Sequence, residues 1–368
     1  MPKKLLLLLI ILIPFSNTNS FGQGNDLWYA FRTEGSNLIG FKDKKGVIKI
    51  QPKFNEMTSI IKFDNIIAVI EDTIGTGNSY YLTKSGKIVG KNSLYHSDNT
   101  NDCESEGFIR FKDPKNGKVG LFNRMGNIVI PAVYDDLSIV QNGLITGLKG
   151  AEKKYFDIDK RKDSEYYYWE GGQQSLMDTL NTTLIENCTT NHLLNFYSLK
   201  KSNAPDTDGI RESFLGKDGN YYSFIDFEKE FKQWIIKVLQ DDLTLEKLIA
   251  NTYDNLLWDT GKGWKKEKKE LLIANNYSLI KNGLLEIIQP STEYFISSNG
   301  LNPFIYEGAE FERYYNNCGE PLVTKYPKMA IYINHYDQKK RIQNSYEFLR
   351  TEFGYQLIGL SIRNNTIK

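Results

Sequence analysis

The sequence has few of the side chains that enzymes use for proton transfer and metal binding. Its 368 residues include only three histidines and three cysteines. The histidines, His96, His192 and His335, lie far apart in the chain. Signatures of serine hydrolases, phosphate-binding loops and HExxH zinc sites are absent as well. We therefore predict no catalytic, cofactor-binding or metal-binding residue and expect no cofactor.

Two local arrangements come nearest to a chemical site. Cys188 and His192 are spaced to share one helical face, as a thiolate and a base or two metal ligands would be. No further cysteine or histidine lies near them, so we expect them to have a packing or surface role. His335 follows an expected strand and precedes Asp337, but a helix-capping turn explains the same residues.

The chain also lacks an excess of either charge. It has 46 basic and 45 acidic residues. A nucleic-acid-binding protein usually carries clustered basic residues in excess, so nucleic acid is not an expected partner. The lysine-rich stretch 262–269 contains an acidic residue and is expected to be a solvated helix face. With this many carboxylates, no pair of them can be chosen as glycosidase residues from the sequence.

Long apolar runs are absent except near the N-terminus. Lys3 and Lys4 precede the apolar run 5–15, and small residues stand at Ser20 and Gly22. The run is shorter than the ~20 residues that span a bilayer. We predict a signal peptide over residues 1–22, cleaved before Gln23, and an exported protein, periplasmic or extracellular, with no stable membrane span. An uncleaved anchor is the alternative.

The three cysteines, Cys103, Cys188 and Cys318, form no recognisable framework. An oxidising compartment permits one bridge between two of them. Cys103 stands in a polar loop and is the one expected to remain free, but the pairing itself stays open.

A repeat with a period of about 40 residues is the strongest pattern present. It aligns one turn glycine, one isoleucine and one large apolar residue in each of three units. The aligned sets are Gly46, Gly86 and Gly126; Ile48, Ile88 and Ile128; and Phe54, Leu94 and Tyr134. Such a period indicates small supersecondary units that bury their apolar faces only by stacking.

Each unit is expected to consist of short strands joined by tight turns. In the third unit, strands 108–111 and 119–122 flank the loop 113–117, and a turn ending at Gly126 leads to the strand 128–130. Pro131 is expected to stop the sheet pairing, and Tyr134 to turn back into the core. The first unit shows this order two periods earlier, and the middle unit is degenerate. A partial fourth unit from Leu144, lacking a turn glycine, is expected to cap the array.

The stretch from Gly120 to Asp136 resembles the WG-repeat family, whose motif combines an aromatic-Gly pair, a polar turn ending in Gly, a strand, Pro and an aromatic followed by an acid. Ile39 and Val119 stand where the family name has Trp. The resemblance covers about residues 27–160. It implies an all-β module of hairpin repeats, often exported in bacteria and used for interaction, without catalytic residues to transfer.

The periodicity ends near residue 162, so we predict a β-repeat domain over 23–165 and an α+β domain over 166–368. Helices are expected over about 224–239, 244–258 and 265–274. Strands are expected at 295–296, 304–306, 329–333 and 355–362, with a helix between Asp337 and Phe353. The role of this second domain is not indicated.

The expected function is that of a non-enzymatic binding or scaffold protein at the bacterial cell envelope, with another protein as partner. Two alternatives remain. One is an envelope-polymer hydrolase, with His335 or His192 and two carboxylates in a polar pocket of the second half. The other is a carbohydrate-binding protein with a flat row of exposed Tyr and Trp. Whether the repeats form an open array or a closed ring is also open.

Overall fold

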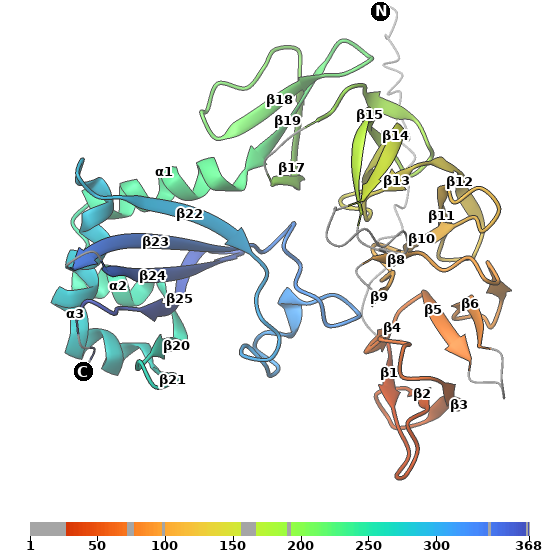
Figure 1. Cartoon of the computed structure of the whole chain (residues 1–368), viewed down its shortest axis with the longest axis horizontal. Coiled ribbons are helices and arrows are strands. Elements are labelled where there is room, and N and C mark those ends of the chain that lie inside the picture. Colours follow the sequence, from red (N-terminus) through yellow and green to blue (C-terminus); the bar gives the residue numbers. More distant parts are fainter. Residues whose placement is uncertain are drawn as a thin grey trace, which may run out of the picture.

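The computed structural model describes residues 27–71, 77–97, 100–155, 167–189, 193–337, 340–365 and 367. It is mostly β-structure, with 49% of residues in strands and 14% in helices. Figure 1 shows the repeats as an arc of short strands on one side, and the described α-helices with a six-stranded sheet on the other. The expected signal segment 1–22 lies outside the described residues.

Three antiparallel meanders of three strands each follow one another in the first part of the chain. Their strands are β1 (Trp28–Phe31), β2 (Ile39–Lys42) and β3 (Ile48–Phe54); β5 (Ile66–Glu71), β6 (Asn78–Thr83) and β7 (Ile88–Val89); and β10 (Phe108–Lys112), β11 (Val119–Asn123) and β12 (Ile128–Tyr134). The two-residue strands β4 (Lys62–Phe63), β8 (His96–Ser97), β9 (Thr100–Asn101) and β13 (Asp136–Leu137) lie between them. These meanders are the three units that the repeat period predicts.

The first and third units have the same strand register. The pairs Ile39–Phe54 and Lys42–Ile48 of β2 and β3 recur two periods later as Val119–Tyr134 and Phe122–Ile128 of β11 and β12. The turns recur as well: a side-chain oxygen accepts a hydrogen bond from the backbone N–H four residues later in all three units. These pairs are Asp43 with Val47, Thr83 with Lys87, and Asn123 with Asn127.

Proline does not end the sheet pairing, contrary to our expectation. β3 runs through Pro52 and β12 through Pro131, and in both units the proline lies within a register shift, between Ile50 and Phe54 or between Ile130 and Tyr134. At the shift the strands approach so closely that a Cβ on Gly40 would lie 2.6 Å from the carbonyl oxygen of Ile50. On Gly120 it would lie 2.7 Å from that of Ile130. The bulge accommodates the proline, which has no N–H to donate, and the glycine allows the two strands to approach closely at the bulge.

The middle unit lacks this feature, in agreement with its degenerate sequence. Tyr80 occupies the position of the glycine, is buried, and donates a hydrogen bond to Glu71. The third strand of this unit, β7 (Ile88–Val89), has only two residues and is followed by Gly90, which has a φ of 59°.

The repeat period places residues both inside and outside the array. Phe54, Leu94 and Tyr134 are buried, as expected for the residues that fill the core. Ile48, Ile88 and Ile128, in contrast, are exposed, because they stand next to the turns at the start of each third strand. The shared period therefore does not by itself identify a core position.

The fourth unit is longer than the partial cap that we predicted. β14 (Leu144–Tyr155) pairs along its length with β15 (Tyr167–Asp178), and β16 (Thr183–Ile185) follows. Its turn uses Asp178, whose side chain accepts from the N–H groups of Leu180 and Thr182. Asn181, with a φ of 66°, takes the place of the turn glycine.

The expected boundary between residues 165 and 166 falls inside this hairpin. Because β14 and β15 pair with each other, the strands on either side of the boundary belong to one sheet. A further sheet follows, formed by β17 (Leu194–Ser202), β18 (Arg211–Leu215) and β19 (Tyr221–Asp226) in the order β17-β19-β18. In the described part of the chain, helices begin only after residue 226.

The last part of the chain combines helices with a six-stranded sheet. Its elements are α1 (Phe227–Gln240), α2 (Leu245–Ala250), β20 (Thr252–Asp259), β21 (Trp264–Lys268), α3 (Lys269–Leu285), η1 (Glu286–Ile288), β22 (Tyr294–Asn299), η2 (Glu312–Tyr314), β23 (Lys328–Asp337), β24 (Lys340–Thr351) and β25 (Gly354–Ser361). The strand order is β21-β20-β25-β24-β23-β22, and β20 pairs parallel to β25. The helices pack on one face of the sheet through a large apolar core.

Helix α1 forms as its sequence predicts. Asp226 accepts hydrogen bonds from the N–H groups of Glu228 and Lys229, and so caps the first turn. Phe227, Phe231, Ile235 and Leu239 form the buried stripe of the helix.

Several other predictions in this part are wrong. The expected helix 244–258 ends at Ala250 and becomes β20, and the expected helix after Asp337 is β24, which pairs with strands on both sides. Phe353, which would have continued the helical stripe, is 87% exposed in the β24–β25 turn. The expected strand 304–306 is a turn, and the helix expected at 265–274 starts at Lys269, after β21. Pairing with neighbouring strands outweighs the local helical spacing here.

Candidate functional site

A loop from the C-terminal part reaches the inner side of the repeat arc. We call residues 312–325 the hub loop; it begins with η2 and approaches β4 and β9 in Figure 1. The carbonyl oxygen of Asn317 accepts hydrogen bonds of 2.9 Å from the N–H groups of both Ile61 and Lys62. At its other end, Lys325 Nζ lies 5.1 Å from the centre of the Tyr197 ring on β17. The hub loop thus contacts both the first unit and the sheet that follows the fourth.

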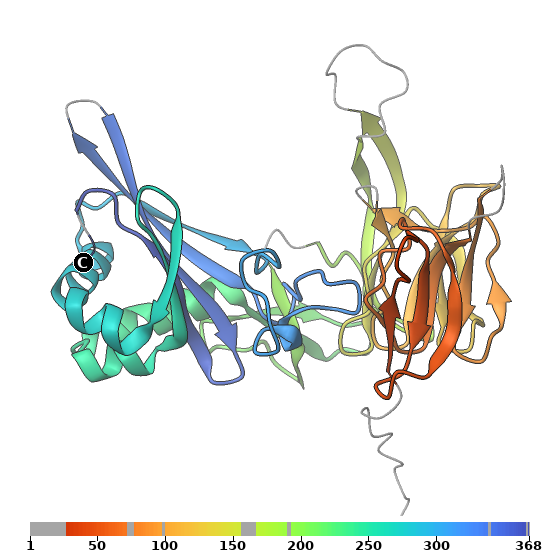
Figure 2. The same cartoon turned by 90° about the horizontal axis from the view of Figure 1, so that it is seen from below.

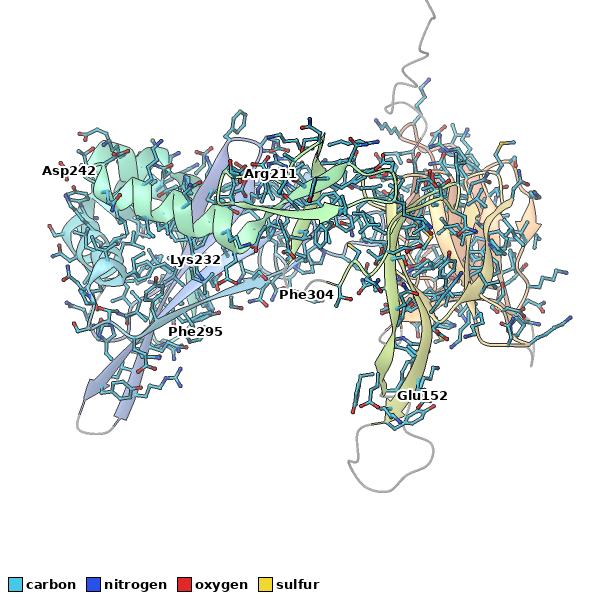
Figure 3. All side chains as sticks on the ribbon, turned by 90° about the horizontal axis from the view of Figure 1, so that it is seen from above. Glu152, Arg211, Lys232, Asp242, Phe295 and Phe304 are labelled. Atoms are coloured by element: carbon cyan, nitrogen blue, oxygen red, sulfur yellow. A yellow bond between two sulfur atoms is a disulfide. The ribbon has the colours of Figure 1, made fainter. Side chains whose placement is uncertain are left out.

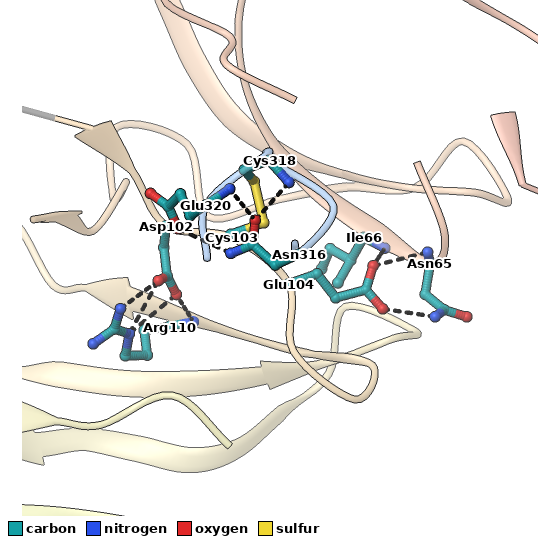
Figure 4. Close-up of a disulfide and its surroundings, with 9 residues drawn as sticks. All are labelled: Asn65, Ile66, Asp102, Cys103, Glu104, Arg110, Asn316, Cys318 and Glu320. Atoms are coloured by element: carbon teal, nitrogen blue, oxygen red, sulfur yellow. Dashed lines mark hydrogen bonds and ion pairs between the residues drawn. A yellow bond between two sulfur atoms is a disulfide. The ribbon is translucent and has the colours of Figure 1, made fainter. Parts of the chain in front are cut away.

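A disulfide fixes the middle of the hub loop to the array. Cys103 and Cys318 are bonded, with Cα atoms 6.1 Å apart and a sequence separation of 215 residues (Figure 4). The expectation that Cys103 stays free is therefore wrong. The free cysteine is Cys188, which is buried, and its burial raises the pKa of its thiol to about 11. The polar residues around Cys103 in the sequence, 100–107, line the cavity between the array and the hub loop.

A cavity of about 1180 Å³ lies between the hub loop and the inner turns of the array. The array contributes residues 64–65 and 100–107 with Arg110 and Arg124, β17 contributes Tyr197, and the hub loop contributes residues 315–317 and 320–325. None of the described histidines lines this cavity. It is the candidate binding site, because three distant parts of the chain meet there.

Glu104 holds the turn before the middle unit. Its carboxylate accepts hydrogen bonds from the N–H groups of Asn65 and Ile66, at 2.9 and 3.1 Å, and from the Asn65 side chain at 2.6 Å (Figure 4). Burial raises the pKa of this carboxyl group above its usual value, although the hydrogen bonds favour the charged form.

Glu106 holds a second turn in the same manner. It accepts hydrogen bonds from the N–H groups of Asn142 and Gly143, at 2.7 and 2.8 Å, and from the hydroxyl of Tyr197 at 2.9 Å. Asn142 and Gly143 both have positive φ, at 53° and 68°. The carboxylate therefore connects the third unit, the fourth unit and β17.

Asp102 and Arg110 form a buried ion pair beside the disulfide (Figure 4). The backbone N–H of Arg110 also donates to Asp102, and its guanidinium stacks 4.1 Å from the centre of the Tyr95 ring. Burial opposes the charge of Arg110, but the adjacent Asp102 carboxylate outweighs it and raises the pKa of the guanidinium. Asp102, Glu104 and Glu106 thus all serve to position the repeats.

The residues that the sequence singled out lie elsewhere. His335, on β23, faces Glu286 with 3.6 Å between Nε2 and a carboxylate oxygen, and its Nε2 lies 3.1 Å from the Asn344 amide nitrogen. His192 lies outside the described residues, and Cys188 is not in a helix. His96 is on β8, where burial lowers its pKa. The fold therefore brings neither His96 nor His335 to the cavity.

The described residues offer neither a metal cluster nor a membrane span. Within them, no group of three or more His, Cys, Asp or Glu side chains is arranged to hold a metal ion. None of the described helices is long and apolar enough to cross a bilayer.

Sequence reasoning missed the hub loop, which carries only one local sign of its role. Asn316 accepts hydrogen bonds from the N–H groups of Cys318 and Glu320, and Gly319 has a φ of 80°. The Asn-x-Cys-Gly order therefore indicates a tight turn presenting a cysteine. It does not indicate the partner of that cysteine, which is 215 residues away.

Comparisons with solved structures give only low scores. A protein titled "Rd1NTF2_05 with long sheet" aligns with a TM-score of 0.22 and 10% identity, over 38% of this chain and 96% of its own. A variant of that protein with five substitutions aligns with a TM-score of 0.19 and 13% identity, over 36% of this chain and 97% of its own. TM-scores this low do not indicate a shared fold. No curated protein sequence matched it.

A family model matches the N-terminal half in two places. The model is described as WG containing repeat, and it matches residues 39–72 and 120–146. Each match includes the close-approach glycine, Gly40 or Gly120, and the proline that follows it in the bulged strand. The middle unit, which has Tyr80 in place of the glycine, lies mostly between the two matches. The N-terminal half of this chain therefore contains repeats of the WG family.

Proposed function

We propose that this protein is an exported, non-enzymatic binding protein that acts at the bacterial cell envelope. Its repeat array and C-terminal part, joined by the hub loop, form one platform for a protein partner. The cavity between them is the part of that platform where the partner binds. The role of the α+β part is to carry the hub loop into the arc.

The observation that carries this proposal is the hydrogen bonding of three carboxylates that line the cavity. Of the five acids that line the cavity, Asp102, Glu104 and Glu106 accept hydrogen bonds from backbone N–H groups and from the side chains of Arg110, Asn65 and Tyr197. Carboxylates held in this way fix the shape of a surface, whereas a general acid or base needs a free oxygen near the substrate. A rigid, polar concave surface built from three distant segments suits recognition of a partner.

Two features support export. The apolar run 5–15 has the length of a signal-peptide core. The Cys103–Cys318 disulfide belongs to a class of bond that persists in oxidising compartments such as the periplasm or the cell exterior. A periplasmic or extracellular location is therefore part of the proposal.

The test uses the mature chain as bait with a matched pair of variants. Thr324 lines the cavity, and Thr260 lies in the β20–β21 turn, far from it in sequence. We expect a protein from envelope extract to bind the wild type directly when purified. Thr324→Arg should weaken its binding by about tenfold because it places a bulky charge in the cavity, and Thr260→Arg should leave binding unchanged. Equal binding by both variants, or no direct partner, would contradict the proposal.

The same preparation tests the hydrolase alternative. The chain is incubated with isolated envelope polymers, and release of soluble fragments is measured. Release that His335→Ala abolishes would overturn the non-enzymatic proposal and assign a catalytic function to the β23 histidine. The expected result is no release from either protein.

A further inference from the structure

The fourth unit extends into a two-stranded ribbon that leaves the body of the protein. We call residues 149–155 and 167–173 the distal ribbon; Figure 2 shows it projecting beyond the other units, and Glu152 marks it in Figure 3. Its pairs run from Lys149–Gln173 to Tyr155–Tyr167. The ribbon carries aromatic residues that belong to none of the hydrophobic core clusters among the described residues.

The two faces of the distal ribbon differ in composition. Because side chains alternate along a strand, one face carries Lys149, Lys153 and Tyr155 from β14 and Tyr167 and Trp169 from β15. We call this the aromatic face. The opposite face carries Glu152, Lys154, Tyr168 and Glu170, and Lys154 pairs with both acids.

Contacts between the two strands explain part of the aromatic content of this face, because they stabilise the ribbon. Tyr155 and Tyr167 meet with ring centres 6.1 Å apart, and Tyr167 and Trp169 with centres 5.4 Å apart. Lys153 Nζ lies 3.9 Å from the centre of the Tyr167 ring. Such pairs stabilise a ribbon that has no core beneath it. Even so, Tyr155 remains 56% exposed and Tyr167 37% exposed.

Charge separates the two faces further. The aromatic face holds two lysines and no carboxylate, and among the described residues neither Lys149 nor Lys153 has an acidic partner. Each is instead placed over an aromatic ring, Lys149 over Tyr134 and Lys153 over Tyr167. This face is therefore complementary to an anion that also presents apolar C–H surface.

We propose that the aromatic face of the distal ribbon binds a linear acidic polysaccharide lying along it. The lysines pair with the acidic groups of the sugar chain, while the tyrosine and tryptophan rings contact its C–H surfaces. This site goes beyond the protein-binding function proposed above, and it involves different residues.

The ring orientations favour an acidic chain over a neutral one. A platform for neutral sugars needs rings that lie flat in one plane, but the planes of Tyr155 and Tyr167 meet at 60° and those of Tyr167 and Trp169 at 81°. Lys153 also covers the Tyr167 ring. The expectation of a flat aromatic row is thus not met on this ribbon, and ion pairing has to supply the affinity that flat stacking would otherwise give.

A side-on polymer also fits better than an anionic membrane. A ribbon that enters a bilayer end-on takes both faces with it, including Glu152 and Glu170. Anionic headgroups would repel these carboxylates. A chain that lies along one side contacts only the face that has none.

The two faces provide matched variants for the test. Binding of the mature chain to alginate oligosaccharides is measured by calorimetry for wild type, Lys149→Gln/Lys153→Gln and Lys154→Gln. We expect the double variant to bind about tenfold more weakly and the Lys154 variant to bind as wild type. Tyr167→Ser should likewise weaken binding, while Tyr168→Ser on the opposite face should not. Circular dichroism confirms that each variant is folded.

The probes also decide between ligand classes. Neutral dextran should bind at least tenfold more weakly than alginate, and alginate binding should weaken as salt is added, since ion pairs are screened. The proposal fails if alginate does not bind, if variants of the two faces lose affinity equally, or if only phosphatidylglycerol vesicles or oligothymidylate are bound. Failure of this proposal would not affect the proposal that a protein binds in the cavity, because Thr324→Arg tests the cavity and the ribbon variants test the distal ribbon.

Discussion

The repeat array and the C-terminal part acquire their strand pairings in different ways. In the array, each strand pairs mainly with its sequence neighbour, and the register of the first unit recurs two periods later in the third. In the C-terminal sheet, β20 lies beside β25, the last described strand, with four other strands of the same sheet between them in sequence. Local turn chemistry therefore sets the strand pairing within each unit, whereas the C-terminal sheet depends on contacts between segments far apart in sequence.

The largest expected effect is that of removing the disulfide that joins the array to the C-terminal part. In the chain-entropy account a loop closed over 215 residues contributes up to about 5 kcal/mol. Cys103→Ser/Cys318→Ser should lower the free energy of unfolding by several kcal/mol, and the array and the C-terminal part should then unfold in separate guanidinium transitions. Cys188→Ser is the control and should cost about 1 kcal/mol. Coincident curves for the double variant and the oxidised wild type would refute this role.

The close-approach glycine of the bulge should tolerate substitution less well than a glycine that only adopts a positive φ. A Cβ at Gly120 would lie 2.6 Å from the Phe111 ring and 2.7 Å from the Ile130 carbonyl oxygen. Gly120→Ala should therefore cost about 3 kcal/mol, measured by urea denaturation. Gly117→Ala, at a φ of 68° but with open space for its methyl group, should cost about 1 kcal/mol. Equal costs would mean that the structure relaxes around a methyl group at Gly120, so that the close approach does not require glycine.

Glu104 should give the array a pH dependence opposite in sign to that of Asp259 on β20, whose pKa is lowered by hydrogen bonds despite its burial. Burial raises its pKa in the folded protein above the ordinary value of 4.5. The folded state then binds more protons than the unfolded state between these two values, so stability should fall as pH rises through that interval. Urea denaturation across pH 4 to 8 checks this. The slope should be weaker in Glu104→Gln, and an unchanged slope would assign the effect to another group.

The smallest effect is expected in the turn of the fourth unit. Asp178→Ala removes two side-chain hydrogen bonds to backbone N–H groups and should cost about 1 kcal/mol in thermal unfolding. Asn181→Gly should change stability by less than about 0.5 kcal/mol, because asparagine already tolerates the positive φ. A large gain from Asn181→Gly would show that the fourth turn is strained in comparison with those that carry glycine.

The array was predictable because its signals are local. The turn glycines Gly46, Gly86 and Gly126 all have positive φ, and the strands that flank them occur where the sequence places them. The error at Pro131 was to treat proline as the end of pairing, although Gly120 in the preceding strand provides the bulge that tolerates it. The family motif includes both residues but does not state their physical relation.

The candidate site was not predictable for the opposite reason. Its parts are turn residues and a cysteine that look like ordinary loop chemistry in the sequence, and only the fold brings Cys318 to Cys103. In the same way, Tyr346 and Leu349 have helical spacing, but β23 and β25 make their segment a central strand. Long-range pairing decided both cases.

The position of Cys318 also has a consequence for the order in which the chain can fold. Cys103 and Cys188 are synthesised first, and the native partner of Cys103 follows only after the described α-helices and three of the six strands of the C-terminal sheet. During that interval Cys188 is the thiol nearer to Cys103 in sequence, and it is not the native partner. Cys188 is buried among residues of the fourth unit and of the sheet β17–β19, so it is removed from competition once both have formed. Folding of this region before the disulfide closes would therefore favour the native pairing of Cys103 with Cys318 over a bond to Cys188.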